Sequence, residues 1–480
     1  PTDDFKHRKS FGYPDDVEST DDLLETLRED EDYKLDEAAY IRARIFDMLL
    51  GDWDRHSDQW RWAEFEDDKG KKVFVPIPRD RDQVFANFDG SFLNALRNIM
   101  GSANQFGVYG PNIEDVAWFN AAGSKLDRAL IKRSDKSVWI EQATFIQNAI
   151  DSATVNRAFK KLPTEVQDST IAQVKEHFLA RKENLPDIVA RYYSEFIKFQ
   201  MLTGTDKDDH FTIERMPNRL TRIVAHRIKD GDKDEVLFDR VFDSDETEEI
   251  WLYGLDDDDV FEVVGKGDKP VLIRIIGGQN KDSFTVENGR KIKIYDRRSK
   301  KNEVLERGGA HVRFTNLYEA NMYDYTRKPH SSSSFGLKVA NNPDVGTALT
   351  LSVEKSKTDF IGNPFGKRVQ LSIAYQSITQ GLNINFNKAY AAIFGDVNFF
   401  VGGRYTSKNY TQNFFGFGND TPNFDDRLSL DFNRVNMSFY GGAIGLERDS
   451  DYGSYFRVQL EMESVDFFRN GANFFDTNLT

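Results

Sequence analysis

The sequence predicts a multidomain fold with three parts: a mainly α-helical region over residues 1–210, a small all-β module over 211–310, and the opening part of a transmembrane antiparallel β-barrel over 311–480. Three changes in the pattern of apolar residues predict this division. Helical spacing dominates before about residue 200, short apolar segments between Asp and Gly clusters follow, and longer segments that alternate apolar with polar residues begin near 311. A chain of 480 residues is also expected to form about three domains.

Composition excludes several classes of protein. The chain carries 64 Lys and Arg against 79 Asp and Glu, a balance that argues against wholesale nucleic-acid binding, which needs a concentrated basic surface. There are no cysteines, which excludes a disulfide framework, a thiolate zinc site and a cysteine nucleophile. No apolar run reaches the roughly 18 residues of a membrane-spanning helix, whereas barrel strands leave little hydropathy signal. Because the chain starts at Pro1 without a signal peptide and ends at Thr480 in a β-like stretch, we expect both ends to be cut.

The N-terminal region carries local signals for helix ends. Asp36 can cap a helix whose apolar residues recur at helical spacing, and Gly51 can end it. A β segment over 72–77 follows. Three further helices are predicted, with proline near the first position of the last two: 138–160, 164–183 and 187–200.

The densest group of chemically capable side chains flanks the predicted β segment. Asp54 and Gln59 are five positions apart, the spacing of the base and the amide in a kinase catalytic loop. Phosphoryl transfer needs such a carboxylate and also oxygen ligands for magnesium, and Asp80 follows the next strand where a magnesium-binding aspartate belongs. The alternative is an ion-pair network that ties the loop to the strand. The predicted catalytic residues are Asp54, Arg55 and His56, and the predicted magnesium ligands are Gln59, Asp80 and Asp82.

Two motifs in this region, Asp-Arg-His at 54–56 and Asp-x-x-x-x-Phe at 80–85, resemble those of atypical kinases of the secretory-pathway and spore-coat (CotH) type. The resemblance covers roughly residues 35–200 and includes the stretch 181–185 on a late helix. It implies a kinase-like C-terminal lobe that uses a nucleotide and magnesium as cofactors.

The same resemblance implies roles for particular residues. Asp54 would be the base, and Asp80 and Gln59 would bind the metal. Gln59 stands where most kinases have Asn, which leaves the second metal in question. The phosphate-covering glycine loop and the lysine would precede Pro1. An active kinase and a kinase-like fold without activity therefore both stay open.

Two Gly-Asp-rich segments of the β module, 254–261 and 277–284, resemble the nonapeptide of RTX β-rolls, in which glycines make a turn and aspartates bind calcium. Because the two copies are 23 residues apart, we do not expect them to stack in the regular ladder of a full calcium roll. A lone calcium and solvated acidic turns are the alternatives, since calcium also needs converging backbone carbonyls. The candidate calcium ligands are Asp257, Asp259 and Asp282.

The last part of the sequence fits a soluble β-sandwich or a membrane barrel. Residues 369–375 and 456–462 alternate apolar with polar side chains, the loop over 403–431 is long and aromatic, and many Phe and Tyr residues lie near strand ends, as interfacial girdles require. These features favour the barrel. The segment 413–421 resembles a loop of BamA-type surface-antigen barrels of Gram-negative outer membranes, so that 311–480 would hold about half of such a barrel.

The order of the three parts resembles that of large envelope proteins whose fuller forms carry a calcineurin-like metallophosphoesterase domain; no ligand motif for that domain occurs here. The resemblance implies a protein of the bacterial outer membrane with its soluble part in the periplasm or at the cell surface. It implies outer-membrane lipid and other envelope proteins as partners, and phosphoester chemistry as the activity. Two alternatives stay open: a non-catalytic envelope scaffold or assembly and secretion factor with a pseudokinase-like binding domain, and a soluble calcium-dependent adhesin.

Overall fold

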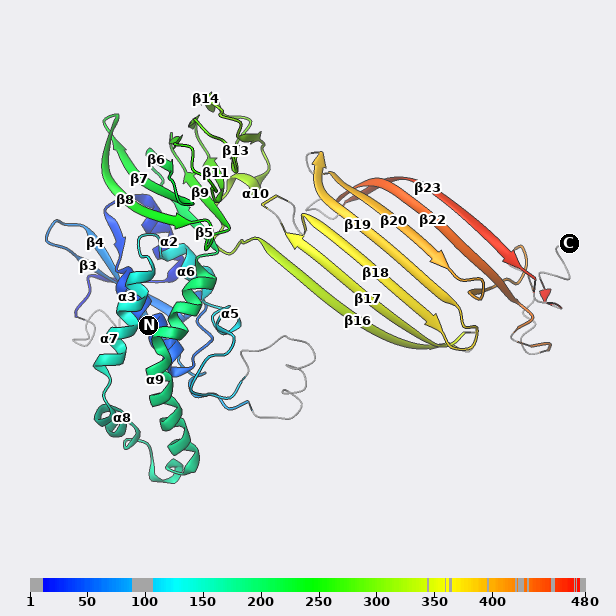
Figure 1. Ribbon diagram of the computed structural model, residues 1–480, viewed down its shortest axis with the longest axis horizontal. Coiled ribbons are helices and arrows are strands. Elements are labelled where there is room, and N and C mark those ends of the chain that lie inside the picture. The colour runs from blue at the N-terminus through cyan, green and yellow to red at the C-terminus, as the bar shows by residue number, and fades with distance from the viewer. Residues whose placement is uncertain are drawn as a thin grey trace. The chain divides into compact units, whose positions relative to one another are not determined.

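The computed structural model describes two compact units, residues 1–327 and 328–480 (Figure 1). The described residues are 12–88, 107–342, 345–358, 360–361, 365–394, 397–418, 421, 427–429, 431–449, 454–469, 471 and 473–474. The prediction of a mainly helical lobe is wrong, because the chain is 23% helical and 43% strand. Helix caps and spacing are local signals, whereas the strands of the first unit form by pairing between distant segments, which the sequence pattern does not record.

The N-terminal part of the first unit combines helices with a four-stranded sheet in the order β1-β3-β4-β2. The strands are β1 (Asp16–Glu18), β2 (Tyr33–Leu35), β3 (Trp60–Glu66) and β4 (Lys72–Pro78). The helices are α2 (Thr20–Glu29), α3 (Glu37–Leu50), η2 (Ser57–Gln59), α5 (Val116–Phe119), α6 (Ser124–Leu130), α7 (Lys136–Ala149), α8 (Ser152–Phe159), η3 (Thr164–Val166) and α9 (Ser169–Phe196).

The predicted ends of α3 are confirmed, but the predicted break at Pro186 is wrong. Asp36 accepts the amide of Ala39 at 2.9 Å, and Gly51 ends the helix with a φ of 85°. Helix α9 instead continues through Pro186. Proline has no amide to donate to the carbonyl four residues earlier, and here Gln147 of α7 donates to that carbonyl at 3.3 Å. A side chain from another helix therefore removes part of the cost of the proline.

Residues 199–314 form a parallel β-solenoid, in which the chain passes back and forth between two sheets. The first sheet contains β5 (Phe199–Thr203), β9 (Glu249–Leu255), β11 (Leu272–Gly278), β13 (Ile292–Asp296) and β15 (His311–Phe314). The second contains β6 (Asp209–Arg215), β10 (Val260–Val264), β12 (Ser283–Val286) and β14 (Glu303–Glu306), extended by the antiparallel pair β7 (Leu220–Lys229) and β8 (Asp232–Asp243). The short helix α10 (Tyr318–Asn321) follows.

The second unit is an eight-stranded antiparallel sheet in the order β16-β17-β18-β19-β20-β22-β21, with β23 paired to β22 (Figure 1). Its strands are β16 (His330–Asn342), β17 (Gly346–Thr358), β18 (Lys367–Gln376), β19 (Leu382–Phe394), β20 (Val397–Thr406), β21 (Thr411–Asn413), β22 (Arg434–Asp449) and β23 (Tyr455–Phe468). Within the described residues β16 and β23 do not pair with each other, so the sheet is open and the prediction of a barrel fold is wrong. Alternation predicts the strands and their faces, but it does not specify whether the edges meet.

Candidate functional site

The predicted phosphoryl-transfer residues lie at the open end of the β3–β4 hairpin. Trp60, the first residue of β3, pairs with Pro78, the last residue of β4. Beyond this pair the amide of Arg79 donates a hydrogen bond of 2.9 Å to the carbonyl of Gln59. The hairpin therefore brings the predicted catalytic loop beside the segment that carries Asp80.

Arg55 lies beneath this loop as a buried cation. Its Nε atom is 3.0 Å from Oδ2 of Asp47, its Nη1 atom is 3.3 Å from Oδ2 of Asp52, and all three side chains are fully buried. Nη1 also donates to the carbonyl of Arg79 at 2.6 Å, and Nη2 donates to that of Gln59 at 3.0 Å. Burial raises the pKa of Asp52 to about 6, while the charge of Arg55 opposes this shift. Arg55 is thus a positioning residue, and the ion-pair alternative accounts for it.

Asp54 and Asp80 are the carboxylates of this loop that could meet a substrate or a metal. Asp54 is half-buried, Asp80 is exposed, and in the part of the chain that the structure describes neither has an ion pair. Asp80 has a φ of 46°, in the left-handed region, and strained backbone of this kind is common at functional sites. His56 is exposed, with Nε2 3.3 Å from Nε2 of Gln59, and Asp82 is exposed.

The described residues contain one group of three acidic side chains whose ligand atoms lie within 4.8 Å of one another: Asp30, Glu31 and Asp32. Glu31 of this group is buried, Asp30 is half-buried and Asp32 is exposed, and the proximity of three acidic side chains does not by itself show an ion site. Asp54, Asp80 and Asp82 form no such group. Magnesium usually keeps several waters and takes only one or two carboxylates from a protein; Gln59 is buried, so the exposed Asp80 and Asp82 are the predicted ligands that could reach it.

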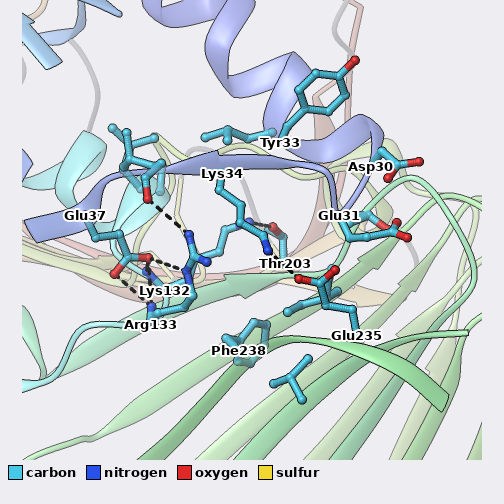
Figure 2. A pocket seen from close by; sticks show the side chains of 18 residues that line it. Asp30, Glu31, Tyr33, Lys34, Glu37, Lys132, Arg133, Thr203, Glu235 and Phe238 are labelled. Carbon is cyan, nitrogen blue, oxygen red and sulfur yellow. Dashed lines mark hydrogen bonds and ion pairs between the residues drawn. The ribbon is translucent and has the colours of Figure 1, made fainter. Parts of the chain in front are cut away.

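A cavity of about 70 Å³ lies between the segment over residues 27–37 and the strands β5 and β8 (Figure 2). The Nζ atom of Lys132 donates a hydrogen bond to the hydroxyl of Thr203, and burial lowers the pKa of Lys132 to about 8. Glu37 accepts the amide of Lys132 at 2.9 Å and that of Ser134 at 2.8 Å. Sequence reasoning missed this cavity, because its lining residues come from distant segments with no shared motif.

The glycine–aspartate segments of the solenoid stack in register, so the expectation that they would not form a regular ladder is wrong. The amide of Asp209 donates to Oδ1 of Asp259 at 2.9 Å, and the amide of Asp259 donates to Oδ1 of Asp282 at 2.9 Å. The amide of Asp282 continues the ladder to Asn302 at 3.0 Å. The first rung went unrecognised in the sequence because the β7–β8 hairpin separates it from the next rung by 50 residues.

Each aspartate of the ladder lies over a glycine five positions earlier. A Cβ atom at Gly254 would collide with Oδ2 of Asp259, and one at Gly277 would collide with Oδ2 of Asp282. Gly204 has the same relation to Asp209. Glycine is therefore required at these positions because the carboxyl group of the same turn fills the space of a side chain.

The ladder carboxyl groups are buried, and their burial raises their pKa values. Burial raises the pKa of Asp209 to about 7, and it raises the pKa of Asp259 well above the ordinary range, with the charges of Asp282 and Asp209 adding to the effect. Burial also raises the pKa of Asp296, which lies beside Asp282. Asp257, Asp259 and Asp282 do not form a group whose ligand atoms all lie within 4.8 Å of one another, so the structure does not bring the three candidate calcium ligands together.

Replacing Asp259 by Asn should remove part of the pH dependence of folding. A raised native pKa means that the folded state binds more protons than the unfolded state, so stability falls as pH rises above the unfolded value of about 3.9. The asparagine side chain keeps an oxygen that can accept the backbone amide of Asp209, and it cannot ionise. We expect Asp259→Asn to be more stable than the native chain by about 1 kcal/mol or more at pH 8. Urea unfolding of the full chain between pH 5 and 8.5 measures this.

The control for this prediction is Asp257→Asn, which makes the same chemical change at a half-exposed residue of the same turn. Equal slopes for the native chain and Asp259→Asn would contradict the assignment of a buried, protonated carboxyl group.

The C-terminal sheet exposes its apolar face and partly buries its polar face. Leu337 of β16, Leu351 of β17, Ile373 of β18 and Tyr405 of β20 lie in one cross-strand row and are 61%, 40%, 37% and 47% exposed. On the other face, Ser352 is less exposed than either apolar neighbour in β17. A sheet in a water-soluble core shows the reverse pattern.

The comparisons with known proteins give no relative. No family model matches the sequence, and neither the curated proteins nor the solved structures contain a match. No helix in the described part of the chain is both long and apolar enough to cross a membrane.

Proposed function

We propose that the chain is an envelope protein of the bacterial outer membrane, whose C-terminal sheet lies with its apolar face against lipid. The observation that carries the proposal is the exposed apolar face of β16–β23. Full burial of one Leu, Ile, Val or Phe side chain contributes about 1.5–3 kcal/mol. When many such side chains stay exposed to water, the folded sheet lacks this stabilisation. Contact of the apolar face with hydrocarbon would bury the same side chains and restore it.

The apolar band crosses the strands obliquely, which supports lipid as its partner. The row through Leu337 is apolar from β16 to β22 and ends at Ser464 in β23. The row through Leu460 of β23 is apolar in β20, β22 and β23 and ends at Ser333 in β16. From β16 to β23 the apolar band is therefore displaced along the strand direction by two rows. Strands that are tilted with respect to a flat hydrocarbon layer require such a shift.

Lipid also imposes a condition on the edges of the sheet. Backbone groups have no hydrogen-bond partners in hydrocarbon, so open edges do not occur there. The outer edges of β16 and β23 are unpaired within the described residues, so their backbone groups would need hydrogen-bond partners in that environment.

Vesicle flotation of the full chain tests this proposal. We expect the protein to float with phospholipid vesicles and to stay with them in alkaline carbonate, which removes peripheral proteins. Recovery of the folded chain in the aqueous phase without detergent would contradict the membrane function and favour a soluble adhesin.

The first unit supports a second candidate function, phosphoryl transfer at the loop of Asp54. The supporting observation is that the β3–β4 register aligns this loop with Asp80. The buried ion pairs of Arg55 with Asp47 and Asp52 hold the loop in place. Asp54 would orient the attacking hydroxyl group and accept its proton, and Asp80 would bind magnesium, which supplies charge stabilisation when bound.

Asp54→Asn and Asp80→Asn should each lower nucleotide turnover by about 100-fold or more, because each removes a single catalytic or metal-binding carboxylate. The measurement is turnover of a nucleoside triphosphate with magnesium by the full chain. Asp58→Asn is the matched control, since Asp58 belongs to the same loop and its side chain is 79% exposed. If all three variants turn over nucleotide at the native rate, the loop has a structural role only, and the result supports the non-catalytic scaffold.

A further inference from the structure

The geometry points to a binding site for anionic lipid headgroups at one edge of the apolar face of the C-terminal sheet. The inference rests on the proposed membrane function and adds the class of lipid and the direction in which the sheet enters it. The site consists of four lysines, called the lysine edge: Lys355, Lys357, Lys367 and Lys388.

Strand register places the four lysines on the apolar face. Lys355 and Lys357 lie two and four residues after Val353 in β17, so their side chains share its face. Lys357 pairs directly with Lys367 of β18. Lys388 of β19 lies one strand further on, two residues from Phe386. The lysines therefore border the apolar band rather than the polar face.

No described protein group neutralises these charges. The two cross-strand rows that hold the lysines run from β16 to β23 without a carboxylate, and within the described residues none of the four lysines has an ion pair. Like charges that face each other directly across two strands destabilise a sheet. The Lys357–Lys367 pair is thus unfavourable unless an anion lies close to both ammonium groups.

An aromatic ring lies beside two of the four lysines. The Nζ atoms of Lys388 and Lys367 lie 5.1 and 5.8 Å from the centre of the Tyr390 ring. Tyr390 pairs with Lys367 and is followed along its row by Phe399. Along this row phenylalanine in β20 gives way to tyrosine in β19 and to lysine in β18, and aromatic rings and long cationic side chains are both favoured in the headgroup layer of a membrane.

The anion that fits this edge is a lipid phosphate. Its negative charge complements the lysines, and its acyl chains continue onto the apolar band, which a free phosphate would leave uncovered. The strand β16 begins at this same end of the sheet, with His330 opposite Thr358. The chain therefore enters the lipid layer on the side whose anionic headgroups meet the lysine edge.

Binding to vesicles of defined charge tests the inference on the full chain. The variant is Lys357→Gln/Lys367→Gln, and the matched control is Lys338→Gln/Arg368→Gln, which makes the same charge change on the polar face of β16 and β18. Each lysine near an anionic surface strengthens binding about fivefold. We expect the variant to bind vesicles with 30% phosphatidylglycerol roughly thirtyfold more weakly than the native chain at low salt. On pure phosphatidylcholine the two should bind equally.

Three results would overturn the inference. The first is an unchanged affinity of the variant for the anionic vesicles. The second is an equal loss in the control. The third is equal binding of the native chain to the anionic and the pure phosphatidylcholine vesicles at low salt, which would show that the lysines do not meet anionic headgroups. Failure of the native chain to bind either kind of vesicle is a different outcome, because it would remove the membrane function itself.

Discussion

Leu351→Arg should destabilise the membrane-bound protein by about 2–4 kcal/mol, the cost of a basic side chain near the middle of the lipid-facing side of a strand. Leu351 lies at the centre of the exposed apolar face, with Leu337 and Ile373 on either side. In hydrocarbon the guanidinium group would have to be desolvated or reach for the interface. The measurement is the free energy of unfolding in urea of the full chain in vesicles.

The control for Leu351→Arg is its neighbour Ser352→Arg, which places the same group on the polar face of β17. We expect a change below about 1 kcal/mol there, as for other substitutions away from lipid. If Leu351→Arg is neutral in vesicles while Ser352→Arg is strongly destabilising, the apolar face does not lie against lipid.

Arg55→Met should lower the stability of the first unit by about 3–5 kcal/mol at pH 7, because it leaves two buried carboxylates without their shared cation. Asp47 would keep only Arg81, at 2.7 Å, and Asp52 would lose its ion pair. The loss should be smaller at pH 5. Burial already raises the pKa of both carboxyl groups, and protonation removes the unpaired charge.

Arg61→Met is the matched control for Arg55→Met. Arg61 lies in the same hairpin, but its partner Asp58 is exposed, and exposed ion pairs contribute at most about 1 kcal/mol. Urea unfolding at pH 5 and pH 7, followed by tryptophan fluorescence, measures both. Equal effects of the two substitutions would contradict the structural role of Arg55.

Local signals in the sequence predict local structure here. The cap at Asp36 and the end at Gly51 require only neighbouring residues, and alternation identifies most strands of the C-terminal sheet with their faces. The continuation of α9 through Pro186 depends on Gln147, a residue of another helix. The open edges of the C-terminal sheet likewise depend on which strands pair, and no single strand carries that information.

The sequence likewise predicts only part of the candidate sites. The spacing of Asp54, Gln59 and Asp80 predicts that they come together, and the hairpin aligns their segments. Arg55, predicted as catalytic, is instead enclosed, because its role depends on Asp47 in the preceding helix. The lysine edge has no sequence motif, since its residues become neighbours only through the register of three strands.

Lipid accessibility along β17 tests the central claim most directly. Because the chain has no cysteine, a single one can be introduced in turn at residues 349–353 and labelled with a fluorophore. In vesicles, labels at Leu349→Cys, Leu351→Cys and Val353→Cys should be quenched by brominated lipid, and labels at Thr350→Cys and Ser352→Cys by iodide in the water. Quenching of all five positions by iodide alone, or the opposite alternation, would contradict the assignment of this face to lipid.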